Sequence, residues 1–173
     1  MKILLMGHPN VGKSAFFNRL TGARAIESNY PGTTVDYTKG WMRLEGENVE
    51  VIDVPGTFSL EAKDKAEEVA VKMLEENREA IIICIIDASK IERGLYLALQ
   101  VIEKGYPVVI ALNMWDVAKD KNIEIDIKKL ENILGVPIVP TIAIGGEGIK
   151  EVVSRIKEAS AVKIEKIIER TDK

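Results

Sequence analysis

The sequence is poor in the residues from which metal clusters and disulfide frameworks are built. It holds one cysteine, Cys84, and one histidine, His8, among 173 residues. A single cysteine excludes a disulfide within the chain, and two such residues are too few for a cysteine- or histidine-based metal site. We therefore expect Cys84, inside the apolar run 80–87, to be a small buried side chain in a reducing compartment.

The chain also lacks a basic excess and a long apolar run. Its 24 lysine and arginine residues face 27 aspartate and glutamate residues, a net charge of −3, so we expect no nucleic-acid partner. No stretch approaches the roughly 20 apolar residues that span a bilayer, and the run Ile3–Met6 is too short for a signal peptide. This chain itself is therefore expected to be soluble and cytoplasmic.

What is present is ordinary for one folded domain, with 46% apolar and 29% charged residues. Short β-branched runs alternate with amphipathic stretches, which predicts an α/β fold with helices on both faces of a mostly parallel sheet. The six predicted strands are 2–6, 37–44, 49–54, 80–87, 108–112 and 137–139. Because residues 37–44 alternate and precede a turn at 45–48, we expect them to pair with 49–54 as one antiparallel edge strand.

Helical patterns fill most of the gaps between the strands. Helices are predicted at 13–20, 65–77, 93–104, 127–134 and 149–159. Gly105 and Gly135 follow two of these patterns and are predicted to stop the helices. Residues 161–173 continue a helical pattern that has no place in the sheet. We therefore expect a main domain over residues 1–160 and a C-terminal helical extension over 161–173, the start of a further helical domain.

The strongest motif runs from Gly7 to Ser14, reads G-x-x-x-x-G-K-S, and lies between a predicted strand and a predicted helix. The glycines let successive N–H groups point inward at a phosphate, and the helix dipole adds positive charge. Lys13 is expected to bridge the β- and γ-phosphates, and Ser14 to offer its hydroxyl to Mg²⁺. A glycine-containing turn that matches by chance is the alternative. The predicted contacts are Gly7, Asn10, Val11, Gly12, Lys13, Ser14 and Ala15.

A carboxylate follows at the end of the strand 49–54, in the segment Asp53-Val54-Pro55-Gly56. Beside a phosphate loop, Asp53 is suited to a Mg²⁺ contact, and the N–H of Gly56 is suited to a γ-phosphate. An ordinary Asp-x-Pro-Gly turn is the alternative.

The tetrapeptide Asn113-Met114-Trp115-Asp116 follows an apolar strand and indicates which base is bound. A carboxylate at Asp116 accepts two hydrogen bonds from guanine, whereas adenine has no such pair of donors, so GTP is favoured over ATP. Asn113 is expected to brace the loop. The predicted base contacts are Asn113, Met114, Asp116, Thr141, Ile142 and Ala143, with the Ala143 N–H donating to the guanine carbonyl.

With these motifs the sequence resembles the translation-factor-like GTPases, and among them the cytosolic G domain of the ferrous iron transport protein B family, FeoB. The resemblance covers residues 1 to about 157. Its specific segments are 29–36, 53–60, 67–70, 113–118 and 135–141. The resemblance implies a P-loop GTPase fold, a first switch ending at Thr34 and a second switch beginning at Gly56. It also implies that the Thr34 hydroxyl joins Mg²⁺ in the GTP state.

The family resemblance further implies partners and a location for the chain. Family members continue into a helical regulatory domain and a membrane permease, which would put this G domain at the cytoplasmic face of the cell membrane as part of a longer protein. The function implied is a GTP-hydrolysing switch that controls an attached ferrous iron permease. A homo-oligomer is left open.

Hydrolysis has to proceed without the glutamine that orients water in Ras-like GTPases, because Thr57 occupies that position. The resemblance to potassium-activated GTPases implies that Asn10 gives a side-chain oxygen to K⁺, in addition to the catalytic parts Lys13, Thr34 and Gly56. A loop-shaping role for Asn10 is the alternative. Arg24 is interpreted as surface charge, and His8 as an exposed bystander.

Two other functions compete with this interpretation. A free-standing GTPase of ribosome assembly or tRNA modification would have the same motifs, but it would normally carry a basic or RNA-binding domain. An ATP-dependent kinase would share the phosphate loop, but Asn113 and Asp116 argue against it.

Overall fold

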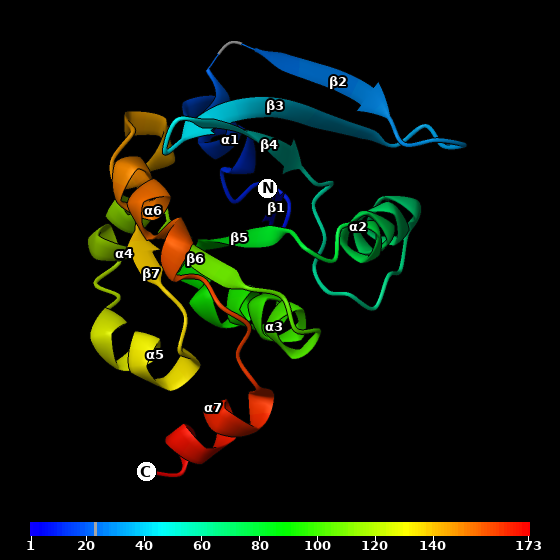
Figure 1. The fold of residues 1–173 in the computed structure, drawn as a ribbon. Coiled ribbons are helices and arrows are strands. Elements are labelled where there is room, and N and C mark those ends of the chain that lie inside the picture. Colours follow the sequence, from blue (N-terminus) through cyan, green and yellow to red (C-terminus); the bar gives the residue numbers. More distant parts are fainter. Residues whose placement is uncertain (23) are drawn as a thin grey trace.

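The computed structural model describes residues 1–22 and 24–173 as one sheet covered by helices on both faces (Figure 1). The strands are β1 Lys2–Met6, β2 Ala25–Asn29, β3 Asp36–Leu44, β4 Glu47–Asp53, β5 Ile81–Asp87, β6 Val108–Asn113 and β7 Ile138–Pro140. The helices are α1 Lys13–Thr21, α2 Lys65–Glu76, α3 Ile91–Glu103, α4 Trp115–Asp120, α5 Ile127–Leu134, α6 Ile149–Arg155 and α7 Ile164–Thr171. Short 3₁₀ turns are η1 Ala88–Lys90, η2 Ala143–Gly145 and η3 Ile156–Glu158.

The seven-stranded sheet has the order β2-β3-β4-β1-β5-β6-β7. The strands β4, β1, β5, β6 and β7 are parallel to their neighbours in that series, while β3 pairs antiparallel with β4 and β2 pairs antiparallel with β3. The six predicted strands are all present. The prediction of six strands with one antiparallel edge is corrected by β2, which adds a seventh, antiparallel strand at the outer edge (Figure 1).

Strand β2 escapes sequence analysis because its pattern is weak. It reads AIESN, and four of its five residues are exposed. Only Ile26 is a large apolar residue, and it is 47% exposed. The strand is therefore stabilised by its backbone pairing with β3 rather than by burial of its own side chains.

The β3–β4 hairpin closes more tightly than predicted. Arg43 faces Asn48 and Leu44 faces Glu47, so the connection is Glu45 and Gly46 alone instead of residues 45–48. Both connecting residues have positive φ, 51° and 87°, as a two-residue type I′ turn requires.

Alternate residues of the central strands divide the core into two layers. One layer packs under α1 and α6 and includes Ile3, Leu5 and Ile83. The other lies under α2, α3, α5 and α7 and includes Leu4, Met6 and Cys84. Every residue of β6 is buried, as expected for a strand covered on both faces. The predicted burial of Cys84 is confirmed, since its side chain is 1% exposed and burial raises the pKa of its thiol to about 12.

The predicted helices are present, and their ends agree within one residue except at two places. The pattern at 149–159 forms α6 only to Arg155 and continues as the 3₁₀ turn η3, and α3 begins at Ile91, two residues before its predicted start. Helix α4 was not predicted. Gly105 and Gly135 follow α3 and α5 with φ of 91° and 71°, which confirms them as helix stops.

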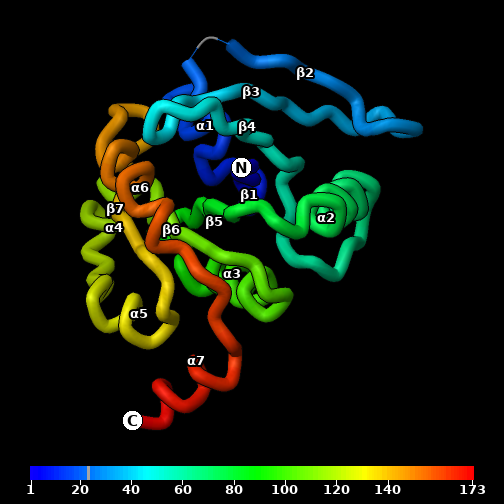
Figure 2. The backbone as a smooth tube through the Cα atoms, viewed as in Figure 1, coloured from blue at the N-terminus to red at the C-terminus, as the bar shows by residue number. Residues whose placement is uncertain are grey.

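The C-terminal extension forms α7, which lies beyond α3 and α5 at the end of the chain (Figure 2). Its Ile167 is 5% exposed and belongs to the same core layer as α3, while Ile168 is 55% exposed. Among the residues that the structure describes, no helix is both long enough and apolar enough to cross a membrane.

Candidate nucleotide-binding site

The predicted phosphate loop connects β1 to α1, which begins at Lys13 within the motif. Two of its glycines are demanded by close contacts. A Cβ on Gly7 would lie 2.5 Å from the carbonyl oxygen of Ile85, and one on Gly12, where φ is 94°, would lie 2.2 Å from Nδ2 of Asn113. The loop is therefore fitted against the ends of β5 and β6. The predicted sequence context of the motif, strand then loop then helix, is confirmed.

Lys13 and Asp53 meet at the inner edge of this loop. Nζ of Lys13 donates to Oδ1 of Asp53 over 2.7 Å and to the carbonyl oxygen of Val54 over 2.9 Å. Their side chains are only 12% and 13% exposed. The end of β4 thus delivers its carboxylate to Lys13, whose neighbour in the chain is the exposed Ser14. The Mg²⁺ contact expected of Asp53 stays a prediction.

The residues expected to form the two switches lie in different surroundings. Thr34 is exposed in the connection between β2 and β3, and no hydrogen bond of its side chain is found among residues 1–22 and 24–173. Gly56 lies against the phosphate loop, where a Cβ would come within 3.0 Å of Pro9. The next residue, Thr57, donates its backbone N–H to the carbonyl oxygen of Gly7 over 3.1 Å. The structure therefore joins Gly56, but not Thr34, to the phosphate loop.

Asn113 links the phosphate loop to the two segments predicted to bind the base, residues 113–116 and 141–143. Its side chain is buried, and Nδ2 donates to the carbonyl oxygen of Val11 over 2.8 Å. Its Oδ1 accepts from Oγ1 of the buried Thr141 over 3.0 Å and from the backbone N–H of Ala143 over 2.9 Å. Asn113 therefore braces three loops at the ends of β1, β6 and β7.

The remaining predicted base contacts surround Asn113. Met114 has a left-handed backbone with φ of 57° and precedes α4, which puts the exposed Asp116 in the first turn of that helix. The Trp115 N–H donates to the carbonyl oxygen of Thr141 over 3.2 Å and ties the two base loops together. Because the Ala143 N–H already donates to Asn113, its donation to guanine stays a prediction.

Glu67 is a buried residue of this region to which sequence analysis assigned no role. It lies in the first turn of α2 and is 5% exposed, yet its carboxylate reaches back into the segment after Gly56. Oε2 accepts from the Phe58 N–H over 3.0 Å and lies 2.9 Å from Oγ1 of Thr57, while Oε1 accepts from the Lys63 N–H over 3.2 Å.

These contacts fix the charge of Glu67. The hydrogen bond from the Phe58 backbone, together with those from Thr57 and Lys63, lowers the pKa of the carboxyl although burial opposes this effect. A sequence signal existed, because Asp64 and Glu67 form the D-x-x-E spacing of a capping box, and the Glu67 N–H does donate to Oδ1 of Asp64 over 2.8 Å.

His8 differs from its prediction as an exposed bystander, because it is half-buried against Phe58. The two ring centroids are 5.0 Å apart, and Nε2 lies 3.2 Å from the Phe58 carbonyl oxygen. Burial lowers the pKa of His8, which favours the neutral form of the ring. His8 therefore packs against Phe58, in the same segment whose backbone is bonded to Glu67. Arg24 is exposed, as expected.

Comparisons with known proteins agree with this geometry. The chain matches the family described as ferrous iron transport protein B over residues 1–156. A curated relative, the Fe(2+) transport protein A/Fe(2+) transporter FeoB fusion protein of Porphyromonas gingivalis, is 40% identical over 153 residues, which are 87% of this chain and 18% of that protein. The chain therefore spans about a fifth of the length of that relative.

Two solved structures have the same fold. The cytosolic domain of L. pneumophila FeoB is 37% identical over 94% of this chain and 70% of that chain, with a TM-score of 0.87. An S. thermophilus NFeoB mutant bound to GDP is 37% identical over 93% of this chain and 63% of that chain, with a TM-score of 0.85. The predicted P-loop GTPase fold is confirmed by this likeness.

Proposed function

Because the chain belongs to the ferrous iron transport protein B family, we propose that it is the GTP-binding and GTP-hydrolysing domain of a ferrous iron transporter. In this proposal it switches between GTP and GDP states and controls a membrane permease in the same, longer protein. Its partners are guanine nucleotide and the helical and permease regions of that protein. Its location is the cytoplasmic face of the membrane.

The observation that carries the proposal is the bridge made by Asn113. One buried amide joins the carbonyl of Val11 in the phosphate loop to Thr141 and Ala143 in the base loop. A site that holds the phosphates and the base of one nucleotide needs such a connection, because the two ends of the ligand bind to separate loops. A phosphate loop that bound a free phosphate would not need it. In support, a 37%-identical relative is described as bound to GDP.

The guanine base is assigned to the carboxylate of Asp116. It is exposed at the start of α4, so the acceptors that guanine requires are free of protein partners among the residues described. The triphosphate is assigned to the backbone of residues 7–15 and to Lys13. When nucleotide binds, a γ-phosphate would replace Asp53 as the partner of Lys13.

A magnesium ion fits the oxygen ligands that this site offers. Ser14 contributes a hydroxyl and Asp53 a carboxylate, the donor types that Mg²⁺ prefers beside phosphate oxygens. No cluster of three or more histidine, cysteine or acidic residues competes for a metal among residues 1–22 and 24–173. When bound, the ion would neutralise charge on the phosphates. Thr34 is proposed as a further ligand in the GTP state, which requires its exposed loop to close over the nucleotide.

The surroundings of Thr57 argue against a role for its side chain in orienting the attacking water. Thr57 stands where Ras-like GTPases have glutamine, and its hydroxyl is 1% exposed and bonded to Glu67 and Ser59. It therefore faces the protein rather than the nucleotide. Two other groups are proposed to promote hydrolysis in place of that glutamine. The Gly56 N–H would donate to the γ-phosphate, and K⁺ held by the exposed Asn10 side chain would offset charge that develops in the transition state.

The proposal is tested by nucleotide specificity. Wild-type chain should bind GTP and GDP in a Mg²⁺-dependent manner and bind ATP far more weakly. Asp116→Asn should weaken GTP binding by about 2–4 kcal/mol and shift preference toward xanthosine triphosphate, because an amide can donate to the extra carbonyl of xanthine. Titration calorimetry with GTP, GDP, ATP and xanthosine triphosphate measures both effects. Equal affinity of the unmodified chain for GTP and ATP would overturn the proposal.

A further inference from the structure

The last turn of α1 carries Arg19, whose side chain extends away from the helix. It binds the second predicted base loop, residues 141–146, which is called the base loop below. Nε of Arg19 donates to the carbonyl oxygen of Ala143 over 3.2 Å, and Nη2 donates to the carbonyl oxygen of Ile144. The guanidinium also lies against Gly146, where a Cβ would come within 3.3 Å of Nη1. A single side chain thus holds two successive carbonyls of the turn η2 and packs on the residue that follows.

The turn itself has little else to hold its outer side. Ala143 is buried and its N–H donates inward to Asn113, but Ile144 is 82% exposed. The ends of the loop are joined to each other by two backbone hydrogen bonds between Ile142 and Glu147. Among the residues described, Arg19 is the side chain from another element that bonds the η2 carbonyls. Opening the turn outward therefore requires the Arg19 contacts to break.

Helix α1 connects this contact to the phosphate end of the site. It starts with Lys13 and Ser14 at the phosphate loop and is nine residues long, so Arg19 lies within two turns of those residues. A cation in the last turn is also favoured by the helix dipole. The helix is rigid over this length. It therefore ties the base loop to the phosphate loop from the outside, while Asn113 ties them from the inside.

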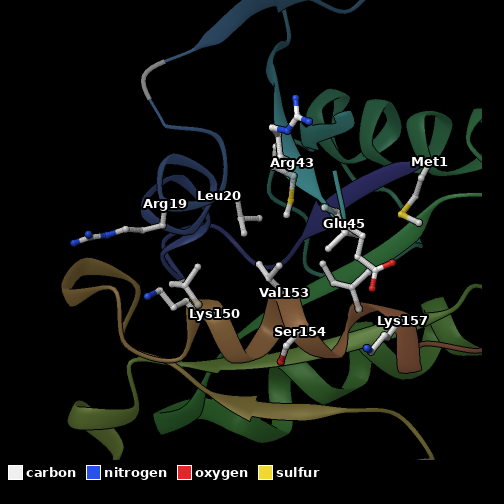
Figure 3. Close-up of a pocket in the computed structure, with 13 residues that line it drawn as sticks. Met1, Arg19, Leu20, Arg43, Glu45, Lys150, Val153, Ser154 and Lys157 are labelled. Atoms are coloured by element: carbon white, nitrogen blue, oxygen red, sulfur yellow. The ribbon is translucent and has the colours of Figure 1, made fainter. Parts of the chain in front are cut away.

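The surroundings of Arg19 provide a matched control. Arg19 and Arg43 both border a groove of about 530 Å³ between α1, α6 and the β3–β4 hairpin. Figure 3 shows Arg19 directed away from the groove and Arg43 across the groove from Lys150 and Val153 of α6. Arg43 donates to the Gly46 carbonyl within its own hairpin and does not bond the base loop. Removing either arginine costs one surface charge, but only Arg19 contacts η2.

We propose that Arg19 is a positioning residue that clamps the base loop closed and thereby sets how long GDP stays bound. The inference rests on the proposed function, because it assigns the loop 141–146 to the guanine base. A bound base contacts the inner side of the loop, and release requires the loop to open. The guanidinium stabilises the closed loop, so its loss accelerates release without altering how nucleotide first reaches the phosphate loop.

The test is stopped-flow release of a fluorescent GDP, mant-GDP, from the Mg²⁺-loaded chain. Arg19→Ala should release it about tenfold faster than the unmodified chain, the scale of losing charge-assisted hydrogen bonds that are partly exposed. The association rate constant should stay unchanged. Arg19→Lys should give an intermediate rate, because an ammonium is a single donor centre that cannot hold both carbonyls. Arg43→Ala should behave as the unmodified chain does.

Amide hydrogen exchange of the nucleotide-free chain gives a readout that does not depend on GDP binding. Arg19→Ala should speed exchange in residues 143–147 and leave the central strands unchanged. If Arg19→Ala released mant-GDP faster but also bound it more slowly by a similar factor, or if amides exchanged faster throughout the sheet, the substitution would have caused a general structural defect. Either result would overturn the clamp. Unchanged release from Arg19→Ala would also overturn it. If the loop exchanges faster but no form binds mant-GDP, it is the proposed function that fails, and the nucleotide part of the inference falls with it.

Discussion

Asn10 has two features that bear on different roles. Its backbone is left-handed, with φ of 65°, a conformation that asparagine tolerates better than most residues. This observation supports the loop-shaping role. Its side chain is also exposed, and no hydrogen bond is found for it among the residues described, so its oxygen is free for a cation. The two roles are compatible, and a substitution separates them.

The potassium role predicts a cation effect on turnover. Without a water-orienting glutamine, basal hydrolysis should be slow, within a few powers of ten of about 10⁻⁴ s⁻¹. Turnover should rise roughly tenfold or more when K⁺ replaces Na⁺, since K⁺ in contact with the phosphates offsets developing charge. Phosphate release measured in the two salts at matched ionic strength tests this, because screening alone changes phosphate affinity.

The Asn10→Ala variant supplies the control for the cation effect. It should abolish the difference between K⁺ and Na⁺ while mant-GDP still binds. Asn10→Gly keeps the left-handed backbone accessible and isolates the side-chain oxygen from loop shape. Equal rates in both salts for the unmodified chain would leave Asn10 with its loop-shaping role alone.

At the scale of elements, the segment after Gly56 is held by α2 through one carboxylate. Glu67 accepts from the Phe58 and Lys63 backbones, and Thr57 donates to the phosphate loop at Gly7. Any movement of Gly56 toward a γ-phosphate therefore acts on a segment that is already bonded at both ends. The segment after Gly56, where the resemblance places the second switch, is therefore anchored to the first turn of α2.

Glu67 predicts an acid-sensitive segment. Its pKa is lowered chiefly by the Phe58 hydrogen bond, so its contribution to stability is complete above the ordinary glutamate value of about 4.5 and is lost as pH falls through the lowered pKa. Glu67→Gln should reduce the free energy of unfolding at pH 7 by about 1–3 kcal/mol, because an amide cannot accept from all the same donors. Urea unfolding of the unmodified chain and of Glu67→Gln, each at pH 7 and at pH 3, measures this change in free energy.

The comparison of the two pH values isolates the carboxylate from other titrating groups. The difference in unfolding free energy between the unmodified chain and Glu67→Gln should shrink at pH 3, because this pH lies below the ordinary glutamate value of about 4.5 and protonation then favours the unfolded chain over the folded one, whose Glu67 pKa is lowered. Glu68→Gln, an exposed neighbour on α2, should change little at either pH. A difference that is as large at pH 3 as at pH 7 would contradict the charge argument.

The elements that sequence analysis identified are those with strong local patterns. The strands β1, β5 and β6 are apolar except for one polar or charged residue at one end of each, and glycines with positive φ end α3 and α5. Strand β2 has no such pattern, because an edge strand depends on pairing and not on burial. The contacts of Arg19 were invisible for a similar reason. An exposed arginine on a helix has no local signal for a partner that lies more than a hundred residues away.

At the scale of the whole molecule, α7 belongs to the core although it follows the matched family segment 1–156. Ile167 packs into the layer that also holds residues of α3, and Nη1 of Arg170 donates to the Ile133 carbonyl over 3.2 Å. Apolar packing therefore continues across the boundary at residue 160 that sequence analysis proposed between the main domain and the extension.

Adjacent isoleucines of α7 test this packing. Ile167→Ala should lower the free energy of unfolding by about 2 kcal/mol, because it empties a buried position, and Ile168→Ala should change it by less than about 0.5 kcal/mol. Denaturant unfolding followed by tryptophan fluorescence measures both, since Trp41 and Trp115 lie outside α7. Equal, small effects would show that α7 unfolds independently of the sheet.

Much of the candidate site could be anticipated because its motifs lie where strands end. The segment 7–14 follows a strand, and the segments 53–56 and 113–116 each begin with the last residue of a strand. Parallel strands bring those ends together at one edge of the sheet. Thr34 was harder to place for the opposite reason. It lies in a loop between two antiparallel strands, and no strand end fixes its position relative to Ser14 and Asp53.

The burial of Cys84 has a practical consequence for following the base loop. A thiol reacts as its thiolate, and with a pKa of about 12 and 1% exposure this one is inert at neutral pH. Cys84 is also the sole cysteine of the sequence. A substitution Ile144→Cys, at a position that is 82% exposed, would therefore create a unique attachment point for a maleimide dye or a spin label. The unmodified core thus permits site-specific labelling of the loop with no background to remove.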